Sequence, residues 1–112
     1  MVARGKIIIV PSVTDYLNEL IKVLHDKGYF AYLTSAENYV SDIYDFIEEN
    51  INLVRHYNSP TELSSFGTFY ITYNPNRRTT WYIFFEKKHE NYLIIHISNN
   101  HSKLSNLMDS GS

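Results

Sequence analysis

Three strand-like segments in succession, between Gly67 and Ser102, constrain the fold of this chain more than any other feature of the sequence. They are rich in Thr, Tyr, Phe, Trp and Ile, the residue types that fit a pleated, half-buried surface. Turn-forming residues separate them: Asn74-Pro75-Asn76 in the first gap and His89-Glu90-Asn91 in the second. Short gaps of this kind join strands in antiparallel order. The second half of the chain therefore predicts antiparallel strands at residues 68–73, 79–87 and 92–98.

Alternation along these segments assigns their side chains to two faces of the sheet. In the middle segment one face receives Trp81, Ile83 and Phe85, and the other receives Thr80, Tyr82, Phe84 and Glu86. In the last segment Leu93, Ile95 and Ile97 oppose Tyr92, Ile94 and His96. Both faces are largely apolar or aromatic. We therefore predict that one face is covered and that the other carries a surface of tyrosine and histidine side chains.

Two amphipathic helices are predicted in the first half of the chain, about Val13–Lys27 and Ala36–Tyr57, because apolar residues recur there at helical spacing. A short apolar strand at residues 6–10 precedes them. The order is β-α-α-β-β-β, which predicts an α+β fold: an antiparallel sheet with a helical hairpin packed on one face and strand 6–10 at an edge. The predicted core includes Leu20, Ile21, Ile43, Ile47, Ile83 and Ile95.

The composition fits one domain, which we place at residues 1–102, followed by a Ser-rich tail at 103–112 that we expect to be flexible. The chain has no cysteine, which excludes disulfides and zinc–thiolate sites and fits a cytoplasmic protein. No apolar run has the length of a membrane span, and no signal peptide is recognisable. The histidines are scattered, so we expect neither a metal ion nor another cofactor.

Charge and tyrosine content limit the partners of the protein. The formal net charge is −2, and residues 1–57 hold five Lys or Arg against eight Asp or Glu. Binding of nucleic acid must therefore be local and on the strand side. The ten tyrosines allow two interpretations, namely a thin core lined by amphipathic rings or a recognition surface.

The element order and two segments resemble the RelE/ParE superfamily, the toxins of bacterial toxin–antitoxin systems. The first segment is GYFAYLTSAENYVSDIYDFIEEN, from Gly28 to Asn50, and the second is TTWYIFFEKKHENYLIIHISNNH, ending at His101. The resemblance covers roughly residues 6–102. It implies the toxin of a type II system of the plasmid-stabilisation type, a ribosome-dependent mRNA endonuclease, with a small antitoxin protein, mRNA and the ribosome as partners. The alternatives are a ParE-like inhibitor of DNA gyrase or another topoisomerase, and a degenerate member that only binds its antitoxin.

Five side chains are candidates for the catalytic site. His101 follows the last strand, where active members of the superfamily often carry a catalytic Arg, His or Tyr, and imidazole exchanges protons near neutral pH. Arg77 and Arg78 open the middle strand, where guanidinium groups can hold phosphate. Glu86 and His96 complete the set. Antiparallel pairing predicts that Arg78 and His101 meet at one edge of the sheet.

Each candidate also has a simpler interpretation. His101 fits an exposed loop histidine, the two arginines fit a solvated turn, and His96 fits a hydrogen-bonded structural residue. RNA-cleaving relatives often carry an arginine near the position of Thr80-Trp81, and the chain is slightly acidic. These two features favour the non-enzymatic alternatives, whereas His101 and the basic turn favour cleavage.

Overall fold

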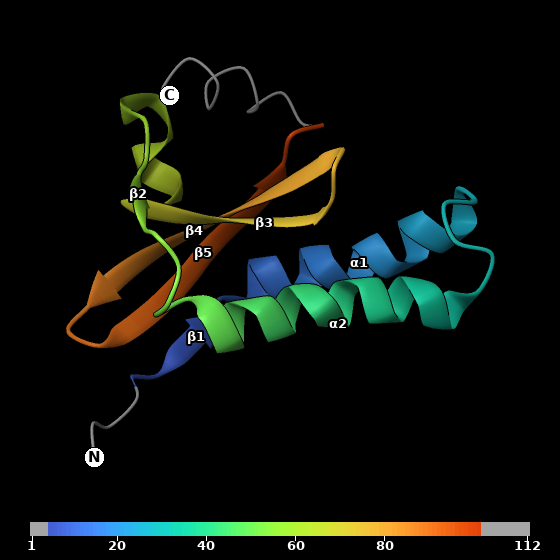
Figure 1. Ribbon diagram of the computed structural model, residues 1–112, viewed down its shortest axis with the longest axis horizontal. Helices are drawn as coiled ribbons and strands as arrows, with labels where there is room; N and C mark the ends of the chain where they lie inside the picture. The colour runs from blue at the N-terminus through green and yellow to red at the C-terminus, as the bar shows by residue number, and fades with distance from the viewer. Residues whose placement is uncertain (1–4, 102–112) are drawn as a thin grey trace.

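The computed structural model describes residues 5–101, and the predicted tail at 103–112 lies outside them. Figure 1 shows an α+β fold in which both helices lie on the same side of one twisted sheet. In chain order the elements are β1 (Ile7–Ile9), α1 (Pro11–Asp26), α2 (Leu33–Asn50), β2 (Tyr57–Asn58), the 3₁₀-helix η1 (Thr61–Phe66), β3 (Phe69–Asn76), β4 (Thr79–Lys88) and β5 (Asn91–Asn99). No helix in this part of the chain is both long and apolar enough to cross a membrane.

The sheet has the strand order β1-β5-β4-β3-β2. As the sequence predicts, β4 pairs antiparallel with both β3 and β5. Strand β2 also pairs antiparallel with β3. Strand β1 joins the free edge of β5, as expected, but runs parallel to it. The sheet is therefore mixed rather than purely antiparallel. An apolar edge strand can pair in either direction, and its side-chain pattern is the same in both.

The main core lies between the helical hairpin and the inner face of the sheet. Ile43 and Ile47 of α2 and Ile83 of β4 are completely buried there, which confirms these predicted core positions. Leu20 and Ile21 of α1 are only partly buried and pack against the margin of this core. Trp81, also on the inner face, donates a hydrogen bond from its indole N–H to the hydroxyl of Tyr39 on α2 at 2.9 Å. This bond connects the hairpin to the sheet and satisfies a buried donor.

A β-bulge changes the faces of β5. Phe84 pairs with His96 and Phe85 pairs with Ile94, so Ile95 has no partner of its own on β4. The extra residue reverses the alternation beyond it. As a result Tyr92, Ile94 and Ile97 share the inner core, whereas His96 lies on the outer face with Phe84. The predicted assignment of the β5 side chains to the two faces of the sheet was therefore wrong. Ile95 is partly exposed rather than part of the core.

The segment between α2 and β3 differs most from the sequence expectation. Helix α2 ends at Asn50, not near Tyr57, and the chain turns so that Tyr57 and Asn58 pair with Tyr70 and Phe69. The residues predicted as loop then form η1, whose Leu63 and Phe66 pack on Phe84, Tyr70 and Tyr82 in a second cluster. This cluster covers part of the outer face. Toward the β3–β4 turn, Thr72 and Thr80 of that face are partly exposed.

Candidate functional site

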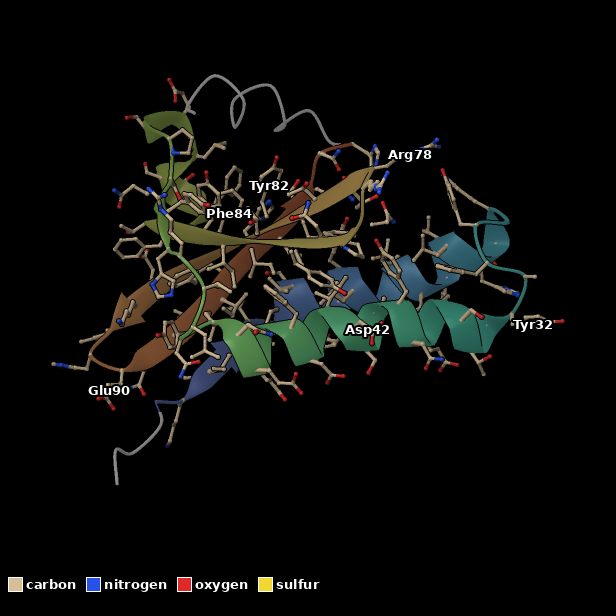
Figure 2. All side chains as sticks on the ribbon, in the orientation of Figure 1. Tyr32, Asp42, Arg78, Tyr82, Phe84 and Glu90 are labelled. Atoms are coloured by element: carbon tan, nitrogen blue, oxygen red, sulfur yellow. The ribbon has the colours of Figure 1, made fainter. Side chains whose placement is uncertain are left out.

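The turn between β3 and β4 lies beside the end of β5, at one end of the sheet. Arg77 and Arg78 form the turn, and both side chains are exposed. The β4–β5 register pairs Trp81 with Asn99, which brings His101 beside the first residue of β4. Nε2 of His101 lies 3.4 Å from Oγ1 of Thr79. Figure 2 shows Arg78 at this end of the sheet. We call Arg77, Arg78, Thr79, Asn100 and His101 the strand-end site.

Asn100 holds the two halves of the strand-end site together. Its side-chain amide Nδ2 donates to the carbonyl oxygen of Arg78 at 2.9 Å, and its Oδ1 accepts from the backbone N–H of Thr80 at 3.0 Å. Its own backbone N–H donates to the carbonyl of Thr80 at 3.0 Å. One carboxamide thus uses both a donor and an acceptor to join the start of β4 to the end of β5.

Three more asparagines fix the backbone around these side chains. The N–H of Arg78 donates to Oδ1 of Asn76 at 2.9 Å, and the N–H of His101 donates to Oδ1 of Asn99 at 2.9 Å. Nδ2 of Asn74 donates to Oγ1 of Thr80 at 2.6 Å. The sequence reasoning missed this role, although asparagines near both strand ends were the available signal. Their side chains bond to nearby backbone groups in turns.

The strand-end site carries positive charge that nearby carboxylates do not neutralise. Among residues 5–101 the sole ion pair joins His25 to Asp26, so neither guanidinium of the site is paired with an acid there. The acids of α2 are exposed on the helical-hairpin side of the molecule, and Figure 2 shows Asp42 on α2 and Arg78 at the end of the sheet. Two guanidinium groups at the same end of the sheet as an imidazole supply donors for a phosphate oxyanion and a group that can transfer a proton.

The other two candidates lie elsewhere. Glu86 is seven residues from Thr79 along β4, roughly 20 Å at the rise of a strand. Its Oε2 accepts a hydrogen bond from the N–H of Thr68 at 3.0 Å, so it tethers the segment that precedes β3. His96 lies on the outer face in the middle of β5, opposite Phe84. The structure therefore places Arg77, Arg78 and His101 at the same end of the sheet, where the side chain of His101 contacts Thr79, and it separates Glu86 and His96 from them.

His96 is packed as part of the second cluster. Its ring stacks on Phe66 of η1 with centroids 4.2 Å apart and lies 5.8 Å from Phe84. Burial lowers the pKa of His96 below its ordinary value, because the apolar surroundings disfavour the charged imidazolium. These contacts assign His96 to the packing of η1 on the sheet.

Stability is expected to fall in acid partly through His96. The unfolded chain binds the proton more readily than the folded chain, so the stabilisation is complete above the unfolded pKa, about 6.5, and is lost as the pH falls through the lowered folded pKa. Urea unfolding of wild type and His96→Phe between pH 7.5 and 5 measures this loss. The variant should lose less stability than wild type. His89→Asn, in the exposed β4–β5 turn, is the control, and equal losses in wild type and His96→Phe would contradict the assignment.

Across residues 5–101 there is no cluster of three or more His, Cys, Asp or Glu side chains arranged to hold a metal ion. Comparison of the chain with protein-family models, curated proteins and solved structures gave no match.

Proposed function

We propose that this protein is the toxin of a bacterial type II toxin–antitoxin system and that it cleaves mRNA on the ribosome at the strand-end site. The observation that carries the proposal is the placement of Arg77, Arg78 and His101 at the same end of the sheet, where Asn100 joins the start of β4 to the end of β5 and His101 contacts Thr79. The architecture expected from the RelE/ParE resemblance supports it as well. A helical hairpin lies on one face, and the end of the last strand lies beside a basic turn.

The proposed reaction needs few groups. The 2′-oxygen of a nucleotide attacks the adjacent phosphorus, the bond from phosphorus to the 5′-oxygen breaks, and a cyclic 2′,3′-phosphate and a 5′-hydroxyl result. His101 takes the proton from the 2′-hydroxyl or gives one to the leaving 5′-oxygen. Arg77 and Arg78 stabilise the extra negative charge on the phosphoryl oxygens. The carboxamide of Asn100 bonds the backbone of Arg78 and Thr80 and so joins the turn to the segment that carries His101, which helps to keep the reacting groups in position.

The expected partners follow from the same proposal. A small antitoxin binds the toxin and stops its action, and mRNA in the ribosome is the substrate. Both belong in the bacterial cytoplasm, and the absence of cysteine agrees with a reducing compartment.

A non-enzymatic toxin is the second candidate function. The slight negative net charge and the presence of only one imidazole at the strand-end site favour it. In this case the chain inhibits DNA gyrase or another topoisomerase, or only binds its antitoxin. Arg78 then contributes to a protein interface rather than to a reaction.

Regulated expression in a bacterial host distinguishes these functions, with growth and mRNA integrity followed in the same culture. Wild type is expected to stop growth and to fragment mRNA, whereas Arg78→Ala and His101→Ala are expected to permit growth. Lys88→Ala is the matched control, because Lys88 is an exposed cation at the opposite end of the same strand. Arrest with intact mRNA indicates the topoisomerase alternative. Normal growth with folded wild-type protein and no antitoxin contradicts both the endonuclease and the topoisomerase inhibitor.

A further inference from the structure

A line of tyrosines on the outer face of the sheet is not used by the proposed reaction. The rings of Tyr57 on β2 and Tyr70 on β3 stack with centroids 5.2 Å apart and planes 21° apart. Tyr82 on β4 meets Tyr70 edge-on at 6.0 Å. The guanidinium carbon of Arg55 lies 4.9 Å from the centre of the Tyr57 ring. We call these four residues the tyrosine row.

The tyrosine row is distinct from the tyrosines that build the core. The helical hairpin packs on the inner face, where other tyrosines line the main core or its margin: Tyr16, Tyr39, Tyr44, Tyr73 and Tyr92. Tyr29 and Tyr32 lie between the helices and are 71% and 72% exposed. The three tyrosines of the row are partly exposed, and the edge of η1 packs only against Tyr70 and Tyr82. The tyrosines of the inner face therefore fit the interpretation as core, and the tyrosine row on the outer face fits the interpretation as a recognition surface.

The row leads to the strand-end site. Tyr82 and Thr80 are two residues apart on β4, so both point to the outer face, and Arg78 lies two residues further on at the turn. Figure 2 shows Tyr82 and Phe84 toward the middle of the sheet and Arg78 at its end. A ligand that extends along the outer face toward this end of the sheet therefore passes Tyr82 and then Thr80, whose hydroxyl is held by Asn74, before it reaches Arg78.

The chemistry of the row suits an anionic chain. Arg55 stands at one end and the two arginines of the turn at the other, and within residues 5–101 none of the three forms an ion pair with a carboxylate. The acids within η1 and β4 are Glu62 and Glu86, and Glu86 accepts a hydrogen bond from the N–H of Thr68. Burial, then the neighbouring phenols Tyr57 and Tyr82, raise the pKa of Tyr70, so its hydroxyl keeps its proton. Protonated phenols and guanidinium groups are donors to phosphate and sugar oxygens.

We propose that the tyrosine row binds the sugar–phosphate backbone of a single-stranded RNA segment whose scissile phosphate lies at the strand-end site. This inference rests on the proposed function, because it assigns the path of that substrate. The rings of Tyr57 and Tyr70 stack on each other and Tyr82 meets Tyr70 edge-on, so the row offers hydroxyl groups to the backbone rather than free ring faces to individual bases. The row therefore contributes affinity without base preference. An acidic protein segment is the competing occupant, and it would not require ribose or phosphate spacing.

The probe is a fluorescein-labelled 12-nucleotide RNA with 2′-O-methyl groups, which has no free 2′-hydroxyl and cannot undergo the proposed cleavage. Its affinity is measured by fluorescence anisotropy for wild type and for the double variant Tyr57→Phe, Tyr70→Phe, which removes two hydroxyls and keeps both rings. Loss of these donors is expected to weaken binding about fivefold or more. Arg55→Gln is expected to reduce the dependence of log K on log salt concentration by about 0.7. Tyr29→Phe, Tyr32→Phe is the matched control and should bind like wild type.

The outcomes separate this inference from the proposed function. Equal binding by wild type and the Tyr57, Tyr70 variant overturns the row even when Arg78→Ala and His101→Ala still abolish growth arrest. Absence of oligonucleotide binding by the folded wild-type protein also overturns it, and then favours a protein occupant. Weaker binding by the row variant alone supports the RNA path even when expression fails to stop growth. Circular dichroism and thermal unfolding of each variant establish that it is still folded. A second pair of variants, Tyr57→Leu in the row and Tyr29→Leu as its control, repeats the binding comparison.

Discussion

His101→Ala is expected to lower the rate of RNA cleavage by about 10²-fold or more, the usual scale for the loss of a general acid or base. His101 is exposed at the end of β5, and alanine there removes the one imidazole of the strand-end site. The measurement is cleavage of mRNA in a purified translation reaction that contains ribosomes and the folded protein. Arg78→Ala should also lower the rate, because a guanidinium no longer stabilises the phosphoryl oxygens.

The control for His101→Ala is His89→Asn, which removes an exposed histidine from the other end of the β4–β5 pair. Its cleavage rate should equal that of wild type. Both alanine variants should unfold at the wild-type urea midpoint, because neither side chain belongs to the buried core. Full activity of His101→Ala would contradict the assigned role of the imidazole in cleavage.

Ile47→Ala is expected to lower the free energy of unfolding by about 2–5 kcal/mol. Ile47 is completely buried in the main core between α2 and the sheet, so truncation removes apolar contacts and leaves a cavity. The measurement is urea unfolding at constant pH. Because small domains are marginally stable, a loss of this size is a large fraction of the total.

Leu53→Ala is the matched control, since it shortens an aliphatic side chain that is 75% exposed just after α2. Its unfolding midpoint should remain close to that of wild type. If Ile47→Ala unfolds at the wild-type midpoint, the inner face of α2 does not contribute the packing that the structure indicates.

Much of the fold could be predicted because local patterns and tertiary packing agree. The helical spacing of apolar residues located α1 to within two residues at its start and one at its end, and turn residues separated β3, β4 and β5 correctly. Ile43 and Ile83 were recognised as core because each lies on the apolar face of a regular element. In such segments one period decides both the element and its buried side.

The errors arose where tertiary pairing overrides a local pattern. Ile51 and Val54 continue the apolar stripe of α2, yet the chain leaves the helix at Asn50 so that Tyr57 can pair with Tyr70. Ile95 continues a strict alternation, yet a bulge against β4 moves it out of the core. No local signal identifies a bulge formed by two strands, because the register depends on both partners.

The sequence likewise predicted only part of the arrangement of the candidate site residues. Antiparallel pairing predicts that the start of β4 lies beside the end of β5, and this pairing is confirmed, with His101 in contact with Thr79. Whether Arg78 and His101 act on one phosphate stays a prediction. Glu86 and His96 were included only for their residue types, and their positions on the sheet separate them from it. The contribution of Asn100 depends on two hydrogen bonds across a sequence separation of about twenty residues, which composition does not reveal.

The hydrogen bond between Trp81 and Tyr39 gives the protein a built-in optical reporter. Trp81 is the single tryptophan of the chain, it is 2% exposed, and its indole is bonded to the helical hairpin. Separation of the hairpin from the sheet would admit water to the indole and break this bond, so the emission maximum should shift to longer wavelength. Intrinsic fluorescence thus follows one defined interface, and every unfolding experiment on these variants can be performed without an attached dye.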